Sequence, residues 1–386
     1  MPDPQAMERS SPYYTPEHAA FRETVRRFVA KEIEPFADAW DEAGEFPREL
    51  YRKAADIGLL QLRFPEAYGG IKADRFYSII AGQELARAGS GGVKASLMSH
   101  TIGAPPIALF GSEAMQARVL PPILAGEKIS ALAITEPGAG SDVANLKTTA
   151  RRQGDRFIVR GEKTFITSGM RADFYSVAVR TGGPGMGGIS LLLIERDTPG
   201  FTRTPLKKMG WWASDTATLR FDDCPVPSDN LIGAENGGFK VIMGNFNDER
   251  LGLAISANAF ARVAYEEALA YARLRETFGR PLIKHQVVRH KLVDMLQRVE
   301  ATQALIETIA WRLDQGDYVV PEICVTKNQA TQTLAFCASE AVQIFGGAGF
   351  MRGAKVERIY REVKVNAIGG GAEEIMKDLA ARQLGW

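Results

Sequence analysis

The chain has 386 residues, of which 45% are hydrophobic and 24% charged, as expected for a globular protein with a substantial core. Its 47 lysines and arginines nearly balance its 46 aspartates and glutamates, so a net charge of +1 gives no electrostatic argument for binding nucleic acid or an acidic membrane. Three separated cysteines and four histidines predict neither a disulfide framework nor a metal site.

The N-terminal sequence and the hydropathy favour a soluble protein of the reducing cytoplasm. Residues 1–18 lack the apolar core of a signal peptide and the arginine-rich, acid-poor character of a transit peptide. No stretch approaches the roughly 18 uninterrupted apolar residues of a membrane span. We therefore expect a cytoplasmic enzyme with no membrane partner, built from two or three domains.

Helical periodicity dominates residues 1–130. Pro16 precedes an amphipathic run, and further helical patterns cover residues 76–88 and 114–124. The proline pairs at 105–106 and 121–122 are expected to mark helix starts or stops. One face of the first run is apolar: Phe21, Val25, Phe28, Val29 and Ile33.

Short alternating strands replace the helices in residues 131–235. The runs 156–160, 174–179, 189–194 and 216–221 alternate or are continuously apolar, with glycine and proline between them. Residues 225–227 read as a turn. This pattern is typical of a compact antiparallel β domain.

Long helices return in residues 236–386. The runs 239–276, 286–315 and 322–345 carry apolar residues at three- and four-residue spacing, and Gly279 and Pro281 are expected to end the first of them. This spacing predicts a four-helix bundle. The predicted fold class is α+β: an N-terminal α-helical domain, a central antiparallel β domain and a C-terminal four-helix bundle.

Two motifs in the β region could bind a ligand. Residues 133–142 (AITEPGAGSD) run from the end of a strand into a glycine-rich loop. Such a loop either binds a phosphate or flavin through its backbone N–H groups or is a simple tight turn. In residues 161–169 (GEKTFITSG), Phe165 and Thr167 point the same way from a strand. An aromatic ring and a hydroxyl on one face suit a flat heteroaromatic cofactor, and a half-buried strand is the ordinary alternative.

Two further motifs lie among the helices. The arginines of residues 273–282 (RLRETFGRPL) suit either pyrophosphate binding or the C-terminal end of a helix. Glycine-rich breaks at 343–350 (QIFGGAGF) and 368–372 (IGGGA) allow close backbone approach to a ligand. Each motif alone is weak evidence for a ligand site, and the order of the motifs along the chain is stronger evidence.

The chain resembles the acyl-CoA dehydrogenases over essentially its whole length. The segments ITEPGAGSD, KTFITSG, GWWASDTATLRFDD (210–223), RETFGRPL and QIFGGAGF stand in that family's order. The resemblance implies a homotetramer that binds one FAD per subunit, dehydrogenates an acyl-CoA in fatty acid β-oxidation and reduces an electron-transferring flavoprotein.

The resemblance also implies a set of cofactor-binding residues. Phe165 packs on the isoalloxazine ring and Thr167 bonds near N5, while Ala372 stands where relatives usually carry a threonine, so one hydroxyl is missing. The residues implied to line the flavin pyrimidine and the pyrophosphate are Ile134, Thr135, Gly140 and Ser141, and Glu374 is implied to bind the cofactor as well. The ADP part is implied to bind across a subunit interface through Arg275, Thr277, Phe278, Gln286, Gln343, Gly346 and Gly347.

The catalytic base is where the chain departs from most of the family. Many members carry a catalytic glutamate where this chain has Gly370. Long-chain and isovaleryl-type members lack it and carry their base at the position of Glu249, in the same E-R-L context. The resemblance therefore implies that Glu249 removes the α-proton, that flavin N5 takes the β-hydride, and that the Gly370 N–H polarises the thioester.

Glu249 also has a plain structural explanation. Residues 246–251 are expected to start the first bundle helix, where the helix dipole favours an acidic residue, and Asp248 would fill that role equally well.

The substrate expected from the resemblance is a medium-chain, long-chain or branched acyl-CoA, converted to the trans-2-enoyl-CoA. Lys94 and Met98 match the far end of the acyl pocket, although Lys94 reads equally well as a solvated surface residue. The alternatives are a flavin-dependent oxidase or monooxygenase on the same fold, a non-catalytic nucleic-acid-associated relative, or a purely structural bundle. The implied substrate contacts are Ser141, Lys94, Met98, Asn247, Arg250 and Gly371.

Overall fold

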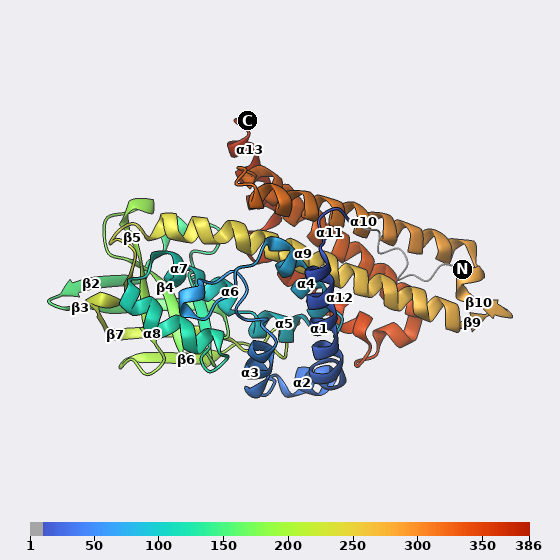
Figure 1. The fold of residues 1–386 in the computed structure, drawn as a ribbon, viewed down its shortest axis with the longest axis horizontal. Helices are drawn as coiled ribbons and strands as arrows, with labels where there is room; N and C mark the ends of the chain where they lie inside the picture. Colours follow the sequence, from blue (N-terminus) through green and yellow to red (C-terminus); the bar gives the residue numbers. More distant parts are fainter. Residues whose placement is uncertain (1–10) are drawn as a thin grey trace.

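The computed structural model describes residues 11–386, which form a helical region, a sheet domain and a helical bundle in chain order (Figure 1). The predicted α+β class and the order of its three parts are confirmed. None of the helices described is long and apolar enough to cross a membrane.

Helices α1 to α8 form the N-terminal region. Thr15 caps α1, and Val25, Phe28 and Val29 bury its apolar face as predicted. Pro121 and Pro122 lie inside α8 rather than at a helix boundary, because α8 ends at Leu124 and only its last turn loses backbone bonds. The bounds are α1 Pro16–Glu32, α2 Ala37–Ala43, α3 Glu49–Asp56, α4 Arg75–Ala86, α5 Gly91–Leu97, α6 His100–Gly103, α7 Pro105–Phe110 and α8 Glu113–Leu124.

The central domain is an eight-stranded sheet in the order β6-β7-β3-β2-β4-β5-β8, with β1 also paired to β4. It is mixed rather than wholly antiparallel, because β1 and β2 both run parallel to β4. The strands are β1 Ser130–Ala133, β2 Thr149–Gln153, β3 Arg156–Thr167, β4 Phe174–Arg180, β5 Ile189–Glu195, β6 Phe201–Pro205, β7 Thr216–Pro227 and β8 Leu231–Ile232.

The turn predicted at residues 225–227 is wrong, because β7 continues through Pro227 in register with Arg156. Strand β6 pairs with β7 only as far as Phe221, so the last residues of β7 form a free edge. Proline is tolerated there because its missing N–H faces no neighbouring strand.

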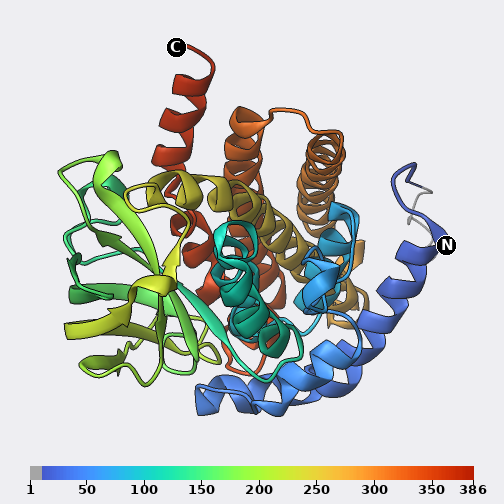
Figure 2. The same ribbon diagram turned by 60° about the vertical axis from the view of Figure 1, so that its left-hand side comes forward.

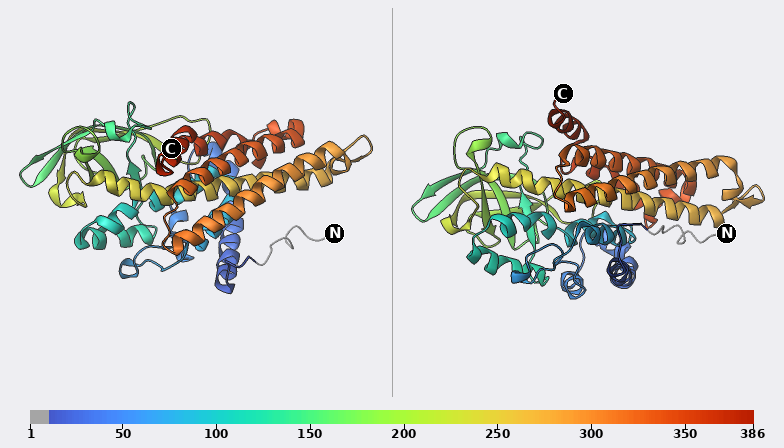
Figure 3. Two further views of the ribbon diagram at one scale, coloured as in Figure 1. Left: turned by 90° about the horizontal axis from the view of Figure 1, so that it is seen from above. Right: turned by 45° about the horizontal axis from the view of Figure 1, so that its top comes forward.

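The C-terminal part is a bundle of α9 Gly238–Leu274, α10 Gln286–Asp314, α11 Val320–Phe345 and α12 Lys355–Ile368. Helix α13 (Glu373–Gln383) projects from it and carries the C-terminus (Figures 1 and 3). The predicted end of α9 at Gly279 and Pro281 is wrong. The helix stops at Leu274 because the chain turns back as a hairpin of β9 (Glu276–Thr277) and β10 (Arg280–Pro281).

Helix α9 joins the sheet domain to the bundle. Its first turns bury Val241 and Ile242 in a core shared with α7, α8 and the sheet, and its later turns bury alanines and Phe260 among α10 and α11. Figure 2 shows the green strands beside the helices of the bundle. A residue in the middle of α9 therefore lies where the domains meet.

Candidate active site

Glu249 lies at this junction, about three turns inside α9. The prediction that residues 246–251 begin the helix is wrong, because α9 starts at Gly238 and its first turns pack against the sheet domain. The dipole of a helix N-terminus acts within the first turn. It therefore does not explain this carboxylate.

The neighbouring carboxylates Asp248 and Glu249 have different surroundings. Asp248 is exposed and forms ion pairs with Arg63 at 3.2 Å and Arg75 at 3.1 Å. Glu249 Oε2 is buried and has no hydrogen-bond partner within residues 11–386. Burial raises the pKa of Glu249 to about 7, although the charges of Arg250 and Lys327 act to lower it.

The loop between α12 and α13 lies against Glu249. Gly370 has a φ of 65°, and a Cβ atom there would lie 3.8 Å from Glu249 Oε1 and 2.5 Å from Leu253 Cδ1. The structure thus brings together Glu249 and Gly370, which have 120 residues between them in the sequence. A side chain at position 370 would compete with Leu253 for space.

Arg250 links the helix to this loop. Its Nε donates to the Gly370 carbonyl at 3.1 Å and its Nη1 donates to Asn247 Oδ1 at 3.3 Å. The implied substrate contacts Asn247, Arg250 and Gly371 therefore cluster around Glu249.

Lys327 of α11 belongs to the same cluster and was missed by sequence reasoning. Its buried Nζ donates to the Ala367 carbonyl at 3.1 Å and to the Gly371 carbonyl at 2.7 Å. The available signal was its spacing, because Lys327 follows Ile323 by four residues and precedes Ala330 by three on the apolar face of a buried helix.

The glycine-rich loop after β1 is anchored by a second buried lysine that sequence reasoning missed. Lys163 Nζ donates to Glu136 Oε1 at 2.8 Å and to the Ile134 carbonyl at 2.9 Å, and Glu136 also accepts from the Lys147 and Thr148 backbone. Burial lowers the pKa of Lys163 to about 8, with Glu136 opposing that shift. The pair lies inside the two motifs and ties the loop to β3.

A bulge presents Phe165. The pairing of β3 with β7 shifts between Lys163 and Ile166, and Phe165 has a φ of 61°. Phe165 is 68% exposed. The next residue, Ile166, is buried, and Thr167 after it is partly exposed. Both side chains are thus accessible from the same strand end.

Helix α5 connects the end of β3 with α12. Ser168 Oγ donates to Ser96 Oγ at 3.4 Å, and the Gly91 N–H donates to Glu362 at 2.8 Å. Lys94 and Met98 follow on this helix and just beyond it, both partly exposed. The Lys94 ammonium forms no hydrogen bond or ion pair with the described part of the chain, and burial lowers its pKa to about 8.

The residues implied for the ADP part of FAD lie at the other end of the molecule. Tyr271 and Phe345 stack with ring centroids 4.2 Å apart, which holds the 3-10 turn Gly346–Phe350 beside the end of α9. The hairpin that carries Phe278 is remote from the sheet domain (Figures 1 and 3). One chain alone therefore does not bring Arg275, Thr277, Phe278, Gln286, Gln343, Gly346 and Gly347 to Phe165 and Thr167.

The two sets nevertheless have features that fit a flavin cofactor. The hydroxyls of Thr135, Ser141 and Thr167 make no hydrogen bond with residues 11–386, and Ile134 is buried behind the loop. An added Cβ at Gly346 or Gly347 would meet nothing within 4 Å, and at Gly140 only Thr135. Ala372 is the N-cap residue of α13 and offers no side-chain hydrogen bond, so the hydroxyl expected there is absent; Glu374, two residues later, is exposed.

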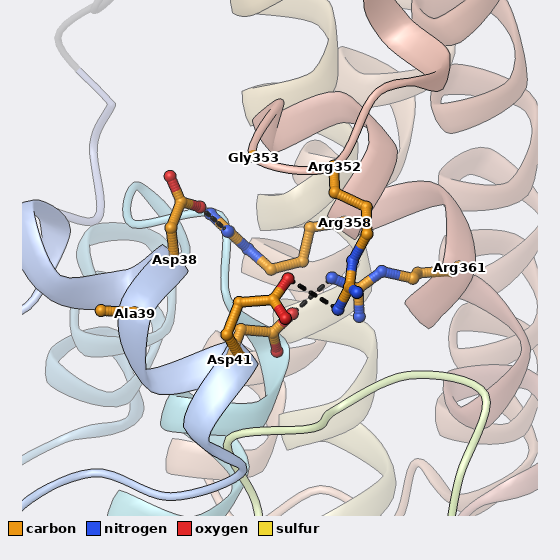
Figure 4. Close-up of a pocket in the computed structure, with 8 residues that line it drawn as sticks. Asp38, Ala39, Asp41, Arg352, Gly353, Arg358 and Arg361 are labelled. Carbon is orange, nitrogen blue, oxygen red and sulfur yellow. Dashed lines mark hydrogen bonds and ion pairs between the residues drawn. The ribbon is translucent and has the colours of Figure 1, made fainter.

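A charged pocket between α2 and α12 is separate from this cluster (Figure 4). Arg358 pairs with Asp38 and Arg361 with Asp41, while Arg361 also lies 3.9 Å from the ring centroid of Trp212. Beside it, buried Glu362 accepts from the Trp211 N–H at 3.0 Å, and burial raises its pKa to about 7. These contacts join α2, α5 and α12 and explain the arginines structurally.

Family models match nearly the whole chain. They describe the acyl-CoA dehydrogenase N-terminal domain at residues 15–127, the middle domain at 131–224 and the C-terminal domain at 236–385.

Individual relatives agree with these matches. An acyl-CoA dehydrogenase of Bacillus subtilis is 38% identical over 96% of this chain and 99% of its own length. The mitochondrial long-chain specific acyl-CoA dehydrogenase of Rattus norvegicus is 36% identical over 96% of this chain and 87% of its own. The crystal structure of a probable acyl-CoA dehydrogenase from Mycobacterium abscessus superposes with a TM-score of 0.95, at 48% identity, over 97% and 100% of the two chains.

Proposed function

The chain belongs to the acyl-CoA dehydrogenases, a family of FAD-dependent oxidoreductases, and we propose that Glu249 is the base that removes the α-proton of its acyl-CoA substrate. The observation that carries this proposal is the Glu249 carboxylate, whose Oε2 is buried without a hydrogen-bond partner among residues 11–386 and whose Oε1 lies beside Gly370. A general base needs a free lone pair and a pKa near the operating pH. The pKa of about 7 meets the second requirement.

The surroundings of Glu249 suit proton removal from a weak carbon acid. The carboxylate has no hydrogen bond that must break before it accepts a proton, within the part of the chain described. The cations of Arg250 and Lys327 keep part of the population ionised despite burial. After proton removal the protonated form of Glu249 is also stable, because burial favours the neutral acid.

Gly370 is proposed to polarise the thioester carbonyl through its backbone N–H. Such a donor is most effective when it is fixed before the reaction begins. The Gly370 carbonyl bonded to Arg250, and the Gly371 carbonyl bonded to Lys327, support this role. When bound, FAD supplies the acceptor for the β-hydride, so that the product is the trans-2-enoyl-CoA.

Thr135, Ser141, Phe165 and Thr167 are proposed to hold the flavin, with Ile134, Gly140, Ala372 and Glu374 around it. The free hydroxyls and the exposed Phe165 ring support this assignment. Because the residues implied for the ADP part lie at the other end of the molecule, we propose that a second subunit supplies them within a homotetramer. An electron-transferring flavoprotein is the proposed oxidant of the reduced enzyme, as the family resemblance implies.

The proposed substrate is a medium-chain, long-chain or branched acyl-CoA. Support comes from Glu249 in place of a loop glutamate and from the similarity to the rat long-chain enzyme. Ser141, Asn247, Arg250 and Gly371 are proposed to contact the thioester part, and Lys94 and Met98 the acyl tail.

Glu249→Gln tests the base assignment. We expect a folded, yellow enzyme whose flavin is not bleached by acyl-CoA under anaerobic conditions, with a loss of about 100-fold or more in rate because the amide cannot accept the proton. A series of acyl-CoA chain lengths on the unmodified enzyme then identifies the substrate from the same absorbance change.

Asp248→Asn is the matched control, because it removes the adjacent carboxylate, which is exposed and ion-paired. We expect it to bleach at a rate close to that of the unmodified enzyme. Near-normal bleaching by Glu249→Gln would remove Glu249 from the mechanism.

A further inference from the structure

Lys327 is a buried charge to which the proposed mechanism gives no direct chemical task. The whole residue is 0% exposed. Its ammonium contacts two backbone carbonyls, at 3.1 Å and 2.7 Å, and forms no ion pair with a carboxylate among residues 11–386. A buried charge is tolerated only where its hydrogen bonds are made. Because carbonyls carry no net charge, they leave the positive charge of Lys327 free to act on its surroundings.

The two carbonyls that Lys327 holds bracket the glycine loop. Ala367 belongs to the last turn of α12 and Gly371 precedes α13. Between them, the Gly370 carbonyl is bound by Arg250 at 3.1 Å, and the Gly369 N–H donates to the Val365 carbonyl at 2.8 Å. Cations from α9 and α11 therefore fix the loop from two sides.

The loop requires these hydrogen bonds to be held in one conformation, because glycine leaves the backbone more conformational freedom than any other residue. Gly370 and Gly371 have φ values of 65° and 112°, and they stand next to a third glycine. Such a segment loses much conformational entropy when it is ordered. A backbone N–H that binds a developing negative charge must already be held in place.

The charge of Lys327 also reaches the base. It lowers the pKa of Glu249 against the effect of burial, and its effect is second to that of Arg250. Burial lowers the pKa of Lys327 itself to about 8, with Glu373 of α13, Glu249 of α9 and Cys324 of α11 opposing that shift and Arg250 reinforcing it. Lys327 is therefore mostly a cation at the pH at which Glu249 ionises.

We propose that Lys327 is a positioning residue for the reaction: it fixes the Gly369–Gly371 loop so that the Gly370 N–H faces the substrate, and its charge favours the ionised carboxylate of Glu249. This inference rests on the proposed roles of Glu249 and Gly370. It adds a third helix, α11, to the groups that prepare the site.

The test is Lys327→Met in the FAD-loaded enzyme, because methionine keeps most of the side-chain length and removes the charge and the donors. The rate of anaerobic flavin bleaching by acyl-CoA falls on the acidic side as Glu249 is protonated. Without the cation we expect this acidic limb of the pH–rate profile to move to higher pH by about 0.5 unit or more. We also expect the plateau rate at high pH to fall about 10-fold or more, because the loop donor is no longer fixed.

Hydrogen exchange supplies a measurement that does not depend on turnover. In the unmodified protein we expect the amides of residues 367–373 to be protected despite the three glycines. In Lys327→Met we expect this peptide to exchange faster while the rest of α11 is unchanged. A loop that exchanges freely in the unmodified protein overturns the inference without any variant.

Asn328→Leu is the matched control. Asn328 is the next residue on α11, is 7% exposed and donates from Nδ2 to the Glu373 carbonyl at 2.8 Å, but it carries no charge. We expect it to lower the melting temperature without moving the acidic limb. Equal displacement of the limb in both variants would show a general structural effect and overturn the electrostatic role.

Lys327→Arg, together with Glu249→Gln, separates the possible failures. Lys327→Arg keeps the charge and is expected to leave the limb near its unmodified position, even if Lys327→Met does not retain flavin; a displaced limb in Lys327→Arg counts against the charge. If Glu249→Gln still bleaches, the proposed function fails. If Glu249→Gln is inactive while Lys327→Met behaves as the unmodified enzyme, only the role of Lys327 fails.

Discussion

At the scale of single residues, the site depends on how two adjacent carboxylates are turned. Asp248 and Glu249 differ by one position on α9, about 100° around the helix axis. That rotation puts Asp248 at the surface with Arg63 and Arg75, and Glu249 beside Gly370. The same side-chain chemistry is therefore a solvated ion pair at one position and a proposed base at the next.

Burial of Glu249 predicts a pH dependence of the reaction. A base must be ionised to act, and the pKa of Glu249 is raised from 4.5 to about 7. We expect the rate of flavin bleaching to fall as the pH drops through about 7, measured by anaerobic stopped-flow absorbance at saturating acyl-CoA. A limb centred near 4.5 would indicate a carboxylate in a water-like environment and would contradict the proposed site.

The same shift has a consequence for stability. The folded-state pKa of this acid lies above its unfolded value, so ionised Glu249 destabilises the fold fully above pH 7, and the effect fades as the pH falls to 4.5. Glu249→Gln should therefore raise the melting temperature more at pH 8 than at pH 5.

At the scale of elements, the contact between α2 and α12 holds the helical region against the bundle. Its pairs are Arg358 with Asp38 and Arg361 with Asp41, beside Trp212 (Figure 4). Glu362 on the same helix binds the backbone of Gly91 and Trp211. Because α12 leads directly into the glycine loop, this contact helps to position the loop as well.

Arg361→Met tests the contribution of this contact. Asp41 is 3% exposed, so its carboxylate would be left buried without its partner, and we expect a loss of about 3–5 kcal/mol in unfolding free energy. Arg352→Met is the control, because its pair with Glu42 is exposed on both sides and should cost at most about 1 kcal/mol. Equal losses in urea unfolding of the two holoenzymes would show that burial does not set the strength of these pairs.

At the scale of the whole molecule, the chain separates two groups of residues that are implied to hold one cofactor. Most of the flavin-end residues lie on the sheet domain, and the residues implied for the ADP part lie on the hairpin, the glycine turn and the adjoining ends of α10 and α11, at the far end of the bundle (Figure 1). Leu274, Phe278 and Phe350 are 83%, 97% and 83% exposed at that end. Because large exposed apolar patches are typical of interfaces, we propose that a second subunit covers this end.

Phe278→Asp tests whether a second subunit covers this end. Phe278 has a φ of 51°, a conformation that aspartate tolerates, so the backbone should not be strained. We expect a smaller assembly by light scattering and a lower FAD content, because the ADP part loses its site. Leu109→Asp is the control, since Leu109 is 70% exposed on α7. An unchanged assembly with full FAD content would contradict the shared site.

Much of the fold and part of the site could be predicted from local patterns. Apolar spacing indicated the long helices of the bundle, alternation indicated β3, β4, β5 and β7, and the order of five motifs indicated the family. These signals are local, because a helix or a strand face is recorded within a few residues. They did not locate the end of α9 at Leu274 or the parallel pairings of β4, since packing against distant segments decides those.

The sequence by itself determined that this chain is an acyl-CoA dehydrogenase with glycine in place of the usual loop glutamate. Only the tertiary structure decided that Glu249 rather than Asp248 faces that loop, and that Lys327 and Arg250 hold its carbonyls. The physical reason is that burial and charge depend on which helices meet. Residues 249, 327 and 370 come together only when α9, α11 and α12 pack around one buried carboxylate.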